Sequence, residues 1–187
     1  GGGSFLYKYK LHEDFETSLV DYYITWGWKS SSKHLPFPAH KLISFYKSGK
    51  KSREGYSQIL YVTTALPRHN IASLEDNSLY FEWQMRFLKN IPDVIEKNIF
   101  IRPHFSDYGW GSKKRLLNFN NTLRFDNHEY SFHSRIKNSR VCVYDYISTT
   151  FAESLALNIP TIVFQFRDIY PICEEMVPYI ELLRKVS

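Results

Sequence analysis

The sequence has 187 residues, of which 43% are hydrophobic, 17% aromatic and 23% charged, and its formal net charge is +5. This is the composition of a globular domain with a sizeable core. No apolar run reaches the roughly 18 residues of a membrane span and no signal peptide opens the chain, so a cytoplasmic location is expected. The small positive charge favours an anionic partner without singling out nucleic acid. Cys142 and Cys173 form no metal-ligand pattern and are expected to be buried free thiols.

The predicted elements alternate between strands and helices. In chain order they are a mixed, partly helical segment at 5–21, a strand at 22–28, a Ser- and Pro-rich loop at 29–41, a strand at 58–64, a helix at 78–91, a strand at 98–104, a helix at 111–121, a strand at 123–126, a helix at 130–139, a strand at 140–146, a helix at 149–158, a strand at 160–166 and a helix at 173–186. The helix at 78–91 is indicated by apolar residues that recur every three or four positions.

This alternation predicts the α/β class, with a Rossmann-like parallel sheet flanked by helices in a single domain over 1–187. Ligands of such sheets bind at the carboxyl ends of the strands. The candidate functional residues should therefore follow the strands directly.

Three hydroxyl residues, Ser148, Thr149 and Thr150, stand between the strand at 140–146 and the helix that follows. Thr150 and Glu153 have the spacing of a capping box, in which each side chain would satisfy the backbone amide of the other residue. That motif leaves Ser148 and Thr149 unexplained. Free amides at a helix start bind anions, so this turn is predicted to bind a phosphate. Glu153 would alternatively accept the two hydroxyl groups of a ribose.

A second group follows the strand at 98–104, where Arg102 and His104 flank Pro103. An Arg and a His together can neutralise a departing phosphate. Arg68, after the strand at 58–64, is another candidate phosphate contact, although it also fits an ordinary surface position. Trp110 would either stack on a base or pack in the core.

Two charged clusters near the beginning of the chain each allow two interpretations. Glu13, with Asp14 and Glu16, would either supply a catalytic carboxylate or form a solvated helix face. The basic residues within 47–53 would either lie in a solvated loop or contact an anionic lipid or phosphate.

Five stretches in the same order resemble the LIC-type family of surface-polysaccharide transferases, relatives of the GT-B glycosyltransferases. They read GGGS, HEDFE, DYYITWGW, RPHFSDYGW and YDYISTTFAESLALNIPTIVF. The resemblance implies that Gly1, Gly2 and Gly3 belong to a glycine loop, and that the chain is the donor-binding half of a longer two-domain bacterial enzyme. It also implies that no metal or other cofactor is needed, and no DxD motif occurs.

Related transferases of capsules and sialic acid hold the phosphate of the donor nucleotide with a His-Pro pair and a Ser/Thr pair. By this resemblance His104 corresponds to the first pair and residues 148–150 to the second, with Phe105 in place of the proline. His104 and Glu13 are then the candidate catalytic residues. The donor would be a nucleotide-sugar, CMP-linked by the same analogy.

The expected function is transfer of a sugar to a cell-surface glycan or lipid-linked acceptor, with peripheral contact to an anionic membrane. One alternative is transfer of an alcohol phosphate from a CDP donor on the same fold. Another is a non-catalytic nucleotide-binding module. Nucleic acid is not an expected partner, because the Lys and Arg residues are scattered apart from one loop.

Overall fold

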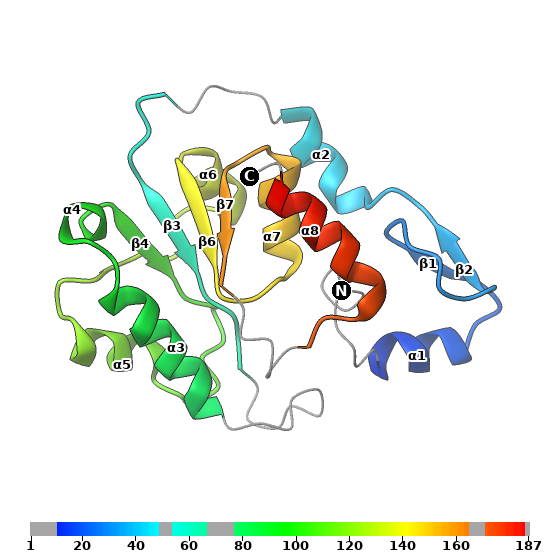
Figure 1. Cartoon of the computed structure of the whole chain (residues 1–187), viewed down its shortest axis with the longest axis horizontal. Helices are drawn as coiled ribbons and strands as arrows, with labels where there is room; N and C mark the ends of the chain where they lie inside the picture. The colour runs from blue at the N-terminus through cyan, green and yellow to red at the C-terminus, as the bar shows by residue number, and fades with distance from the viewer. Residues whose placement is uncertain (1–10, 49–53, 67–76, 165–170, 186–187) are drawn as a thin grey trace.

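The computed structural model describes residues 11–48, 54–66, 77–164 and 171–185. At its centre is a five-stranded parallel sheet of order β5-β4-β3-β6-β7 (Figure 1). Its strands are β3 (Ile59–Val62), β4 (Ile99–Arg102), β5 (Arg124–Phe125), β6 (Val141–Tyr144) and β7 (Thr161–Val163). The predicted Rossmann-like α/β class is confirmed, and these strands fall within the apolar runs from which they were predicted.

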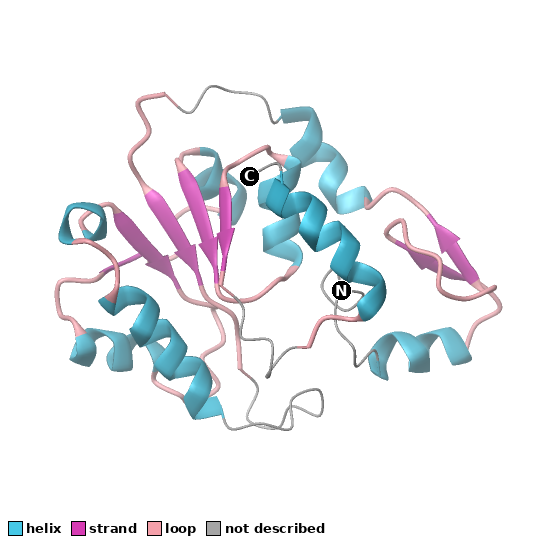
Figure 2. Ribbon diagram, viewed as in Figure 1, coloured by secondary structure: helices cyan, strands magenta, loops and turns pink. Residues whose placement is uncertain are grey.

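Helices cover both faces of this sheet, as Figure 2 shows. They include α3 (Asn77–Lys89), α5 (Ser112–Phe119), α6 (Phe132–Lys137), α7 (Thr149–Ala156) and α8 (Val177–Lys185), with a 3-10 turn at Glu174–Met176 before α8. A further short helix, α4 (Asp93–Glu96), precedes β4. Within the described ranges, no helix has the length and apolar character that crossing a bilayer requires.

The strands are buried on both faces because their side chains alternate between two cores. Leu60 of β3 pairs in register with Cys142 of β6, and both belong to the core shared with α6, α7 and an earlier helix, α2 (His40–Ser48). Tyr61 pairs with Val143 and with Ile101 of β4, and these three belong to the opposite core, formed with α3 and α5. A near-continuous apolar run is the sequence pattern that such a two-sided strand requires.

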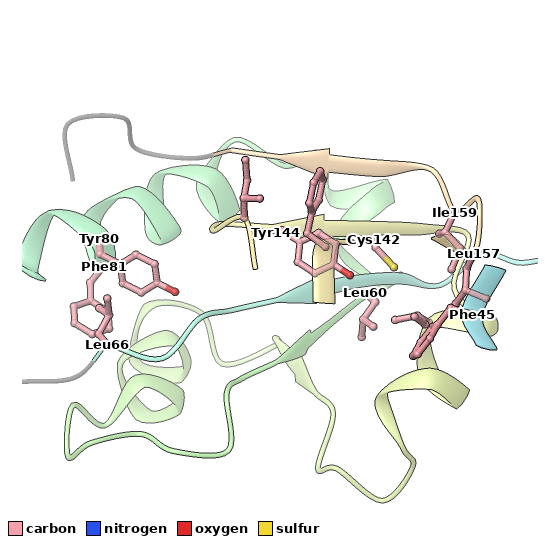
Figure 3. Packing of buried hydrophobic residues seen from close by; sticks show 12 residues of the cluster. Phe45, Leu60, Leu66, Tyr80, Phe81, Cys142, Tyr144, Leu157 and Ile159 are labelled. Atoms are coloured by element: carbon pink, nitrogen blue, oxygen red, sulfur yellow. The ribbon is translucent and has the colours of Figure 1, made fainter. Parts of the chain in front are cut away.

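The first core extends along the strands, from their carboxyl ends to their amino ends (Figure 3). Tyr80 and Phe81 of α3 lie at the carboxyl end of the strands, and Phe45 and Leu157 lie at the amino end. Cys142 and Cys173 are both buried free thiols, as expected from the sequence.

The beginning of the chain forms α1 (Leu11–Ser18), β1 (Tyr23–Thr25) and β2 (His34–Pro36), which Figure 1 shows at the end of the molecule away from α4 and α5. α2 follows and joins this segment to the main core, in which Phe45 packs. β1 and β2 pair as a parallel two-stranded sheet.

One prediction for this segment is wrong and another is confirmed over a shorter range. The strand expected over 22–28 is present as β1 and ends before Gly27, which adopts a φ of 108° and turns the chain. The Ser- and Pro-rich segment 29–41 contains β2, where a loop was expected. β2 forms because Tyr23 N–H donates to Lys33 O at 2.9 Å and Phe37 N–H donates to Thr25 O at 3.0 Å. This pairing is a tertiary contact that outweighs the weak local strand propensity of the segment.

Candidate functional site

Two neighbouring cavities open at the carboxyl ends of the strands. The first, which we call the central cavity, has a volume of about 370 Å³ and is lined by residues 62–65, 102–105, 144–146 and 148–150, together with His128 and Phe132. The second, the side cavity, has a volume of about 570 Å³ and lies toward α3 and α5. Thr63, Thr64, Pro103 and His104 line both cavities. The central cavity lies where the chain order of the strands reverses between β3 and β6, the usual ligand position in open α/β sheets.

The turn into α7 brings Ser148, Thr149 and Thr150 to the wall of the central cavity. Ser148 is the N-cap residue, with an extended backbone (φ −129°, ψ −175°), and its side chain makes no capping hydrogen bond. Its hydroxyl instead pairs with that of Thr150 at 2.7 Å. Within the described residues, no hydrogen bond reaches the Thr149 hydroxyl. The first amides of α7 thus lack a side-chain cap, and free amides at a helix start can bind an anion.

The predicted capping box is therefore wrong. It required Thr150 as the N-cap, but α7 begins before that residue, so Glu153 lies in the second turn of the helix. The carboxylate of Glu153 is 3% exposed and points to α2, where Oε1 lies 2.6 Å from Lys41 Nζ. Glu153 is not among the residues that line the central cavity. It joins α7 to α2, and this position gives no support to ribose binding.

His104 stands on the wall between the two cavities. Its Nδ1 accepts a hydrogen bond from Ser106 N–H at 3.1 Å, and its ring stacks on Phe105 with centroids 4.3 Å apart and planes inclined by 30°. Because Nδ1 accepts, the neutral imidazole carries its proton on Nε2. His104 therefore presents a hydrogen-bond donor at Nε2, which suits an anionic ligand.

Arg102 lines the central cavity, but its guanidinium group is occupied. Nη1 donates to the buried carboxylate of Asp126, and both terminal nitrogens donate to Tyr130 O at 3.3 Å. Arg135 binds the same carboxylate, with Nε at 3.1 Å from Oδ2. Burial alone would raise the pKa of Asp126, but the hydrogen bonds from Arg102 and Arg135 outweigh it and hold this pKa below its ordinary value. The geometry makes Arg102 a structural anchor and does not support the predicted phosphate contact.

Asp126 also fixes His128, a cavity residue that the sequence analysis missed. The N–H of His128 donates to Asp126 Oδ1 at 3.0 Å, and His128 has a positive φ of 62°. That conformation is uncommon outside glycine and brings His128 to the central cavity just after β5. Functional residues were expected directly after the strands of the sheet. His128 follows the short strand predicted at 123–126, so the same expectation applied to that strand would have identified it.

Asp145 is a second residue of the central cavity that the sequence analysis missed. Its Oδ2 accepts from Tyr80 OH at 2.7 Å, Gln84 Nε2 at 2.8 Å and Tyr61 OH at 2.9 Å. Its Oδ1 accepts from Thr64 N–H at 3.2 Å. Complete burial raises the pKa of Asp145 against the opposing effect of these hydrogen bonds. A lone acidic residue at the end of the apolar run VCVYD was the available signal for it.

The start of α5, in the side cavity, already holds an anion of the protein itself. The Asp107 carboxylate accepts from Gly111 N–H at 2.7 Å and from Ser112 N–H at 2.8 Å. Burial would raise the pKa of Asp107, but the hydrogen bonds from Ser112 and Gly111 lower it overall. A bound phosphate would be repelled by Asp107, so the start of α7 in the central cavity is the better anion site.

The other predicted site residues lie elsewhere. Glu13, in α1, is buried and not part of a solvated face; its Oε1 accepts from Trp28 Nε1 at 2.9 Å and lies 3.9 Å from His34 Nε2. It lines neither cavity. Trp110 packs in the core, where its Nε1 donates to Leu66 O at 2.7 Å. Arg68 and the loop of Gly1, Gly2 and Gly3 lie outside the described residues.

No group of three or more His, Cys, Asp or Glu side chains suited to a metal ion occurs in the part of the chain that the structure describes. The parallel sheet, the cavity at its switch point and the uncapped start of α7 define a Rossmann-like α/β domain with a candidate ligand site at the carboxyl ends of its strands. The chain belongs to the LIC12162 family of transferases, whose model matches residues 1–187.

A comparison with solved structures supports the same fold. The 2.2 Å crystal structure of a protein assigned as a UDP-N-acetylglucosamine 2-epimerase from Listeria monocytogenes matches with a TM-score of 0.50. The match covers 96% of this chain at 13% sequence identity, and it covers 52% of the Listeria protein. The chain thus spans about half the length of that structure, and at this identity the likeness concerns the fold alone. No curated protein matches the sequence.

Proposed function

We propose that this chain is the donor-binding half of a GT-B glycosyltransferase that transfers a sugar from a nucleotide donor to a cell-surface glycan. One observation carries the proposal: the central cavity is lined both by the uncapped start of α7, at residues 148–150, and by His104, whose Nδ1 accepts from Ser106 N–H and whose Nε2 is therefore a donor. A volume of about 370 Å³ falls within the range of small-molecule sites, roughly 300–1,000 Å³.

In this proposal the donor's phosphate lies against the amides of residues 148–150 and receives a further hydrogen bond from Nε2 of His104. These groups would stabilise the negative charge that develops on the phosphate as the sugar departs. His104 acts as an electrostatic catalyst, because Nε2 already carries the proton in the neutral ring. Glu13 has no step in this reaction, because Trp28 and His34 occupy its carboxylate. The base that activates the acceptor is left unassigned.

The finer features follow from the same proposal. The donor is a nucleotide-sugar, CMP-linked by the family analogy, and the acceptor is a glycan or a lipid-linked glycan. The reaction needs no metal if the helix amides and His104 carry the phosphate charge. The enzyme acts in the bacterial cytoplasm beside an anionic membrane, to which the basic segment 47–53 would bind; most of that segment lies outside the described residues.

Thr149→Val tests the phosphate position. Its hydroxyl has no hydrogen-bond partner among the described residues, so its loss should leave the fold intact. It should weaken binding of a nucleoside monophosphate by about 10- to 150-fold, the equivalent of one hydrogen bond to a charged group of about 1.5–3 kcal/mol. Calorimetric titration with cytidine monophosphate and with cytidine measures this loss, and cytidine should bind equally well before and after the change.

Thr161→Val is the control for loss of a Thr hydroxyl away from the cavity: Thr161 begins β7 at the amino end of the strands, where its hydroxyl donates to Ile159 O at 2.8 Å. An equal loss for both ligands, or no loss for either, would show that the Thr149 hydroxyl does not contact phosphate. Titration with a CMP-sugar and with CDP-glycerol then decides between sugar transfer and the alternative of alcohol-phosphate transfer.

A further inference from the structure

Phe105 is an exposed aromatic residue on the rim of the central cavity. It is 83% exposed, more than any other large hydrophobic residue that is exposed in the described part of the chain. Single exposed apolar side chains are common on protein surfaces. Phe105 differs from a scattered surface residue because it lines a cavity, together with the hydroxyl residues 148–150 and the imidazoles of His104 and His128.

The orientation of the Phe105 ring is held from one side. The imidazole of His104 stacks on it at 4.3 Å, and His104 is itself fixed by the hydrogen bond from Ser106 N–H. A ring that is stacked on one face and largely exposed elsewhere offers its other face to a ligand. A flat ligand could stack there at little cost in side-chain entropy, because the ring is already positioned.

The position of Phe105 relative to the proposed phosphate site fits a nucleotide. Phe105 follows β4 and Ser148 follows β6, and β3 alone lies between those strands. Neighbouring strands are about 4.8 Å apart, so the two exits are separated by about 10 Å. A ribose can bridge a phosphate at one exit and a base at the other. His128, after the neighbouring β5, lines the same cavity and can offer an imidazole to the edge of that base.

We propose that Phe105 is the stacking platform for the nucleobase of the donor. This rests on the proposed function, since it places the base relative to a phosphate at the start of α7. Stacking is tolerant of base identity because every base has a π face. The Phe105 ring therefore provides affinity for the base, and discrimination between bases is left to groups at the base edge such as His128.

The test is calorimetric titration of the protein and of Phe105→Ala with the monophosphates of cytidine, uridine, adenosine and guanosine, and with ribose 5-phosphate. For the nucleotide that binds best, Phe105→Ala should lose roughly five- to 150-fold in affinity. Ribose 5-phosphate should bind both proteins equally. Phe105→Trp should retain or improve nucleotide affinity, because it restores an aromatic face. The control is Tyr46→Ala, which removes an aromatic residue that is 71% exposed on α2, away from both cavities.

The outcomes separate this inference from the proposed function. If Phe105→Ala binds nucleotides as the unmodified protein does, the stacking role is wrong and the phosphate site stands. If it loses ribose 5-phosphate as strongly as nucleotide, Phe105 acts by holding His104 or a sugar ring, and base stacking is again wrong. If the unmodified protein binds ribose 5-phosphate but no nucleotide, the base subsite does not exist. Failure of the unmodified protein to bind any of these ligands overturns both proposals.

Discussion

Replacing Asp126 with alanine is expected to lower the free energy of unfolding by about 3–5 kcal/mol, the usual cost of removing one partner from a buried ion pair. The Asp126 side chain is fully buried between Arg102 and Arg135, and it also accepts the N–H of His128. Its loss would leave the Arg102 guanidinium group buried with only the carbonyl of Tyr130 as a hydrogen-bond acceptor. Denaturant unfolding measures the effect.

A control and a pH series make this prediction specific. Glu181→Ala removes the half-exposed pair of Glu181 with Arg184 and should cost less than about 1 kcal/mol. The fold lowers the pKa of Asp126 below its ordinary 3.8, so its stabilising effect is complete above that value and is lost as the pH falls through the folded pKa. A cost below about 1 kcal/mol for Asp126→Ala, or the same acid sensitivity with and without Asp126, would contradict the assigned role.

Replacing Asp145 with alanine is expected to cost at least about 3 kcal/mol. Four donors lose an acceptor: the hydroxyls of Tyr61 and Tyr80, Gln84 Nε2 and the N–H of Thr64. Gln84 Nε2 and the N–H of Thr64 keep Tyr80 OH as a second acceptor. A buried donor left without a partner costs about 1–3 kcal/mol, and some of these donors can recover part of this by pairing with one another. Since Thr64 lines the central cavity, nucleotide affinity should fall as well.

Asp145→Asn removes the charge and keeps one acceptor oxygen for the surrounding donors. Burial raises the pKa of Asp145 above 3.8, so the folded state binds this proton more tightly than the unfolded chain does. Stability should therefore fall as the pH rises above 3.8 toward the folded pKa. When unfolding is measured across this pH range, the free energy of unfolding should fall less for Asp145→Asn, because the amide has no such proton. Parallel pH profiles for the two proteins would mean that Asp145 does not carry the assigned proton.

The five central strands were predictable because strands buried on both faces need apolar runs, and helices separate these runs along the chain. β2 and α2 were not predictable from local pattern. β2 depends on backbone hydrogen bonds with β1, and the segment that contains it is rich in Ser and Pro. α2 depends on contacts made far along the sequence, since Phe45 packs in the main core and Lys41 pairs with Glu153 of α7.

The site was partly predictable for the same reason. Residues that follow parallel strands meet at one edge of the sheet, so His104 and Ser148 were expected to be neighbours, and both line the central cavity. The partners of charged residues were not predictable from local sequence. Arg102 is engaged by Asp126, 24 residues away, and Asp145 by Tyr61, 84 residues away.

The most direct test of the donor-site proposal is a crystal structure of the protein with the nucleoside diphosphate that binds it most tightly. A phosphate group should lie within hydrogen-bond distance of the amides of residues 148–150 and of Nε2 of His104, with the base against the open face of Phe105. A nucleotide bound at the start of α5 in the side cavity, or elsewhere on the surface with the central cavity left empty, would contradict the proposed function.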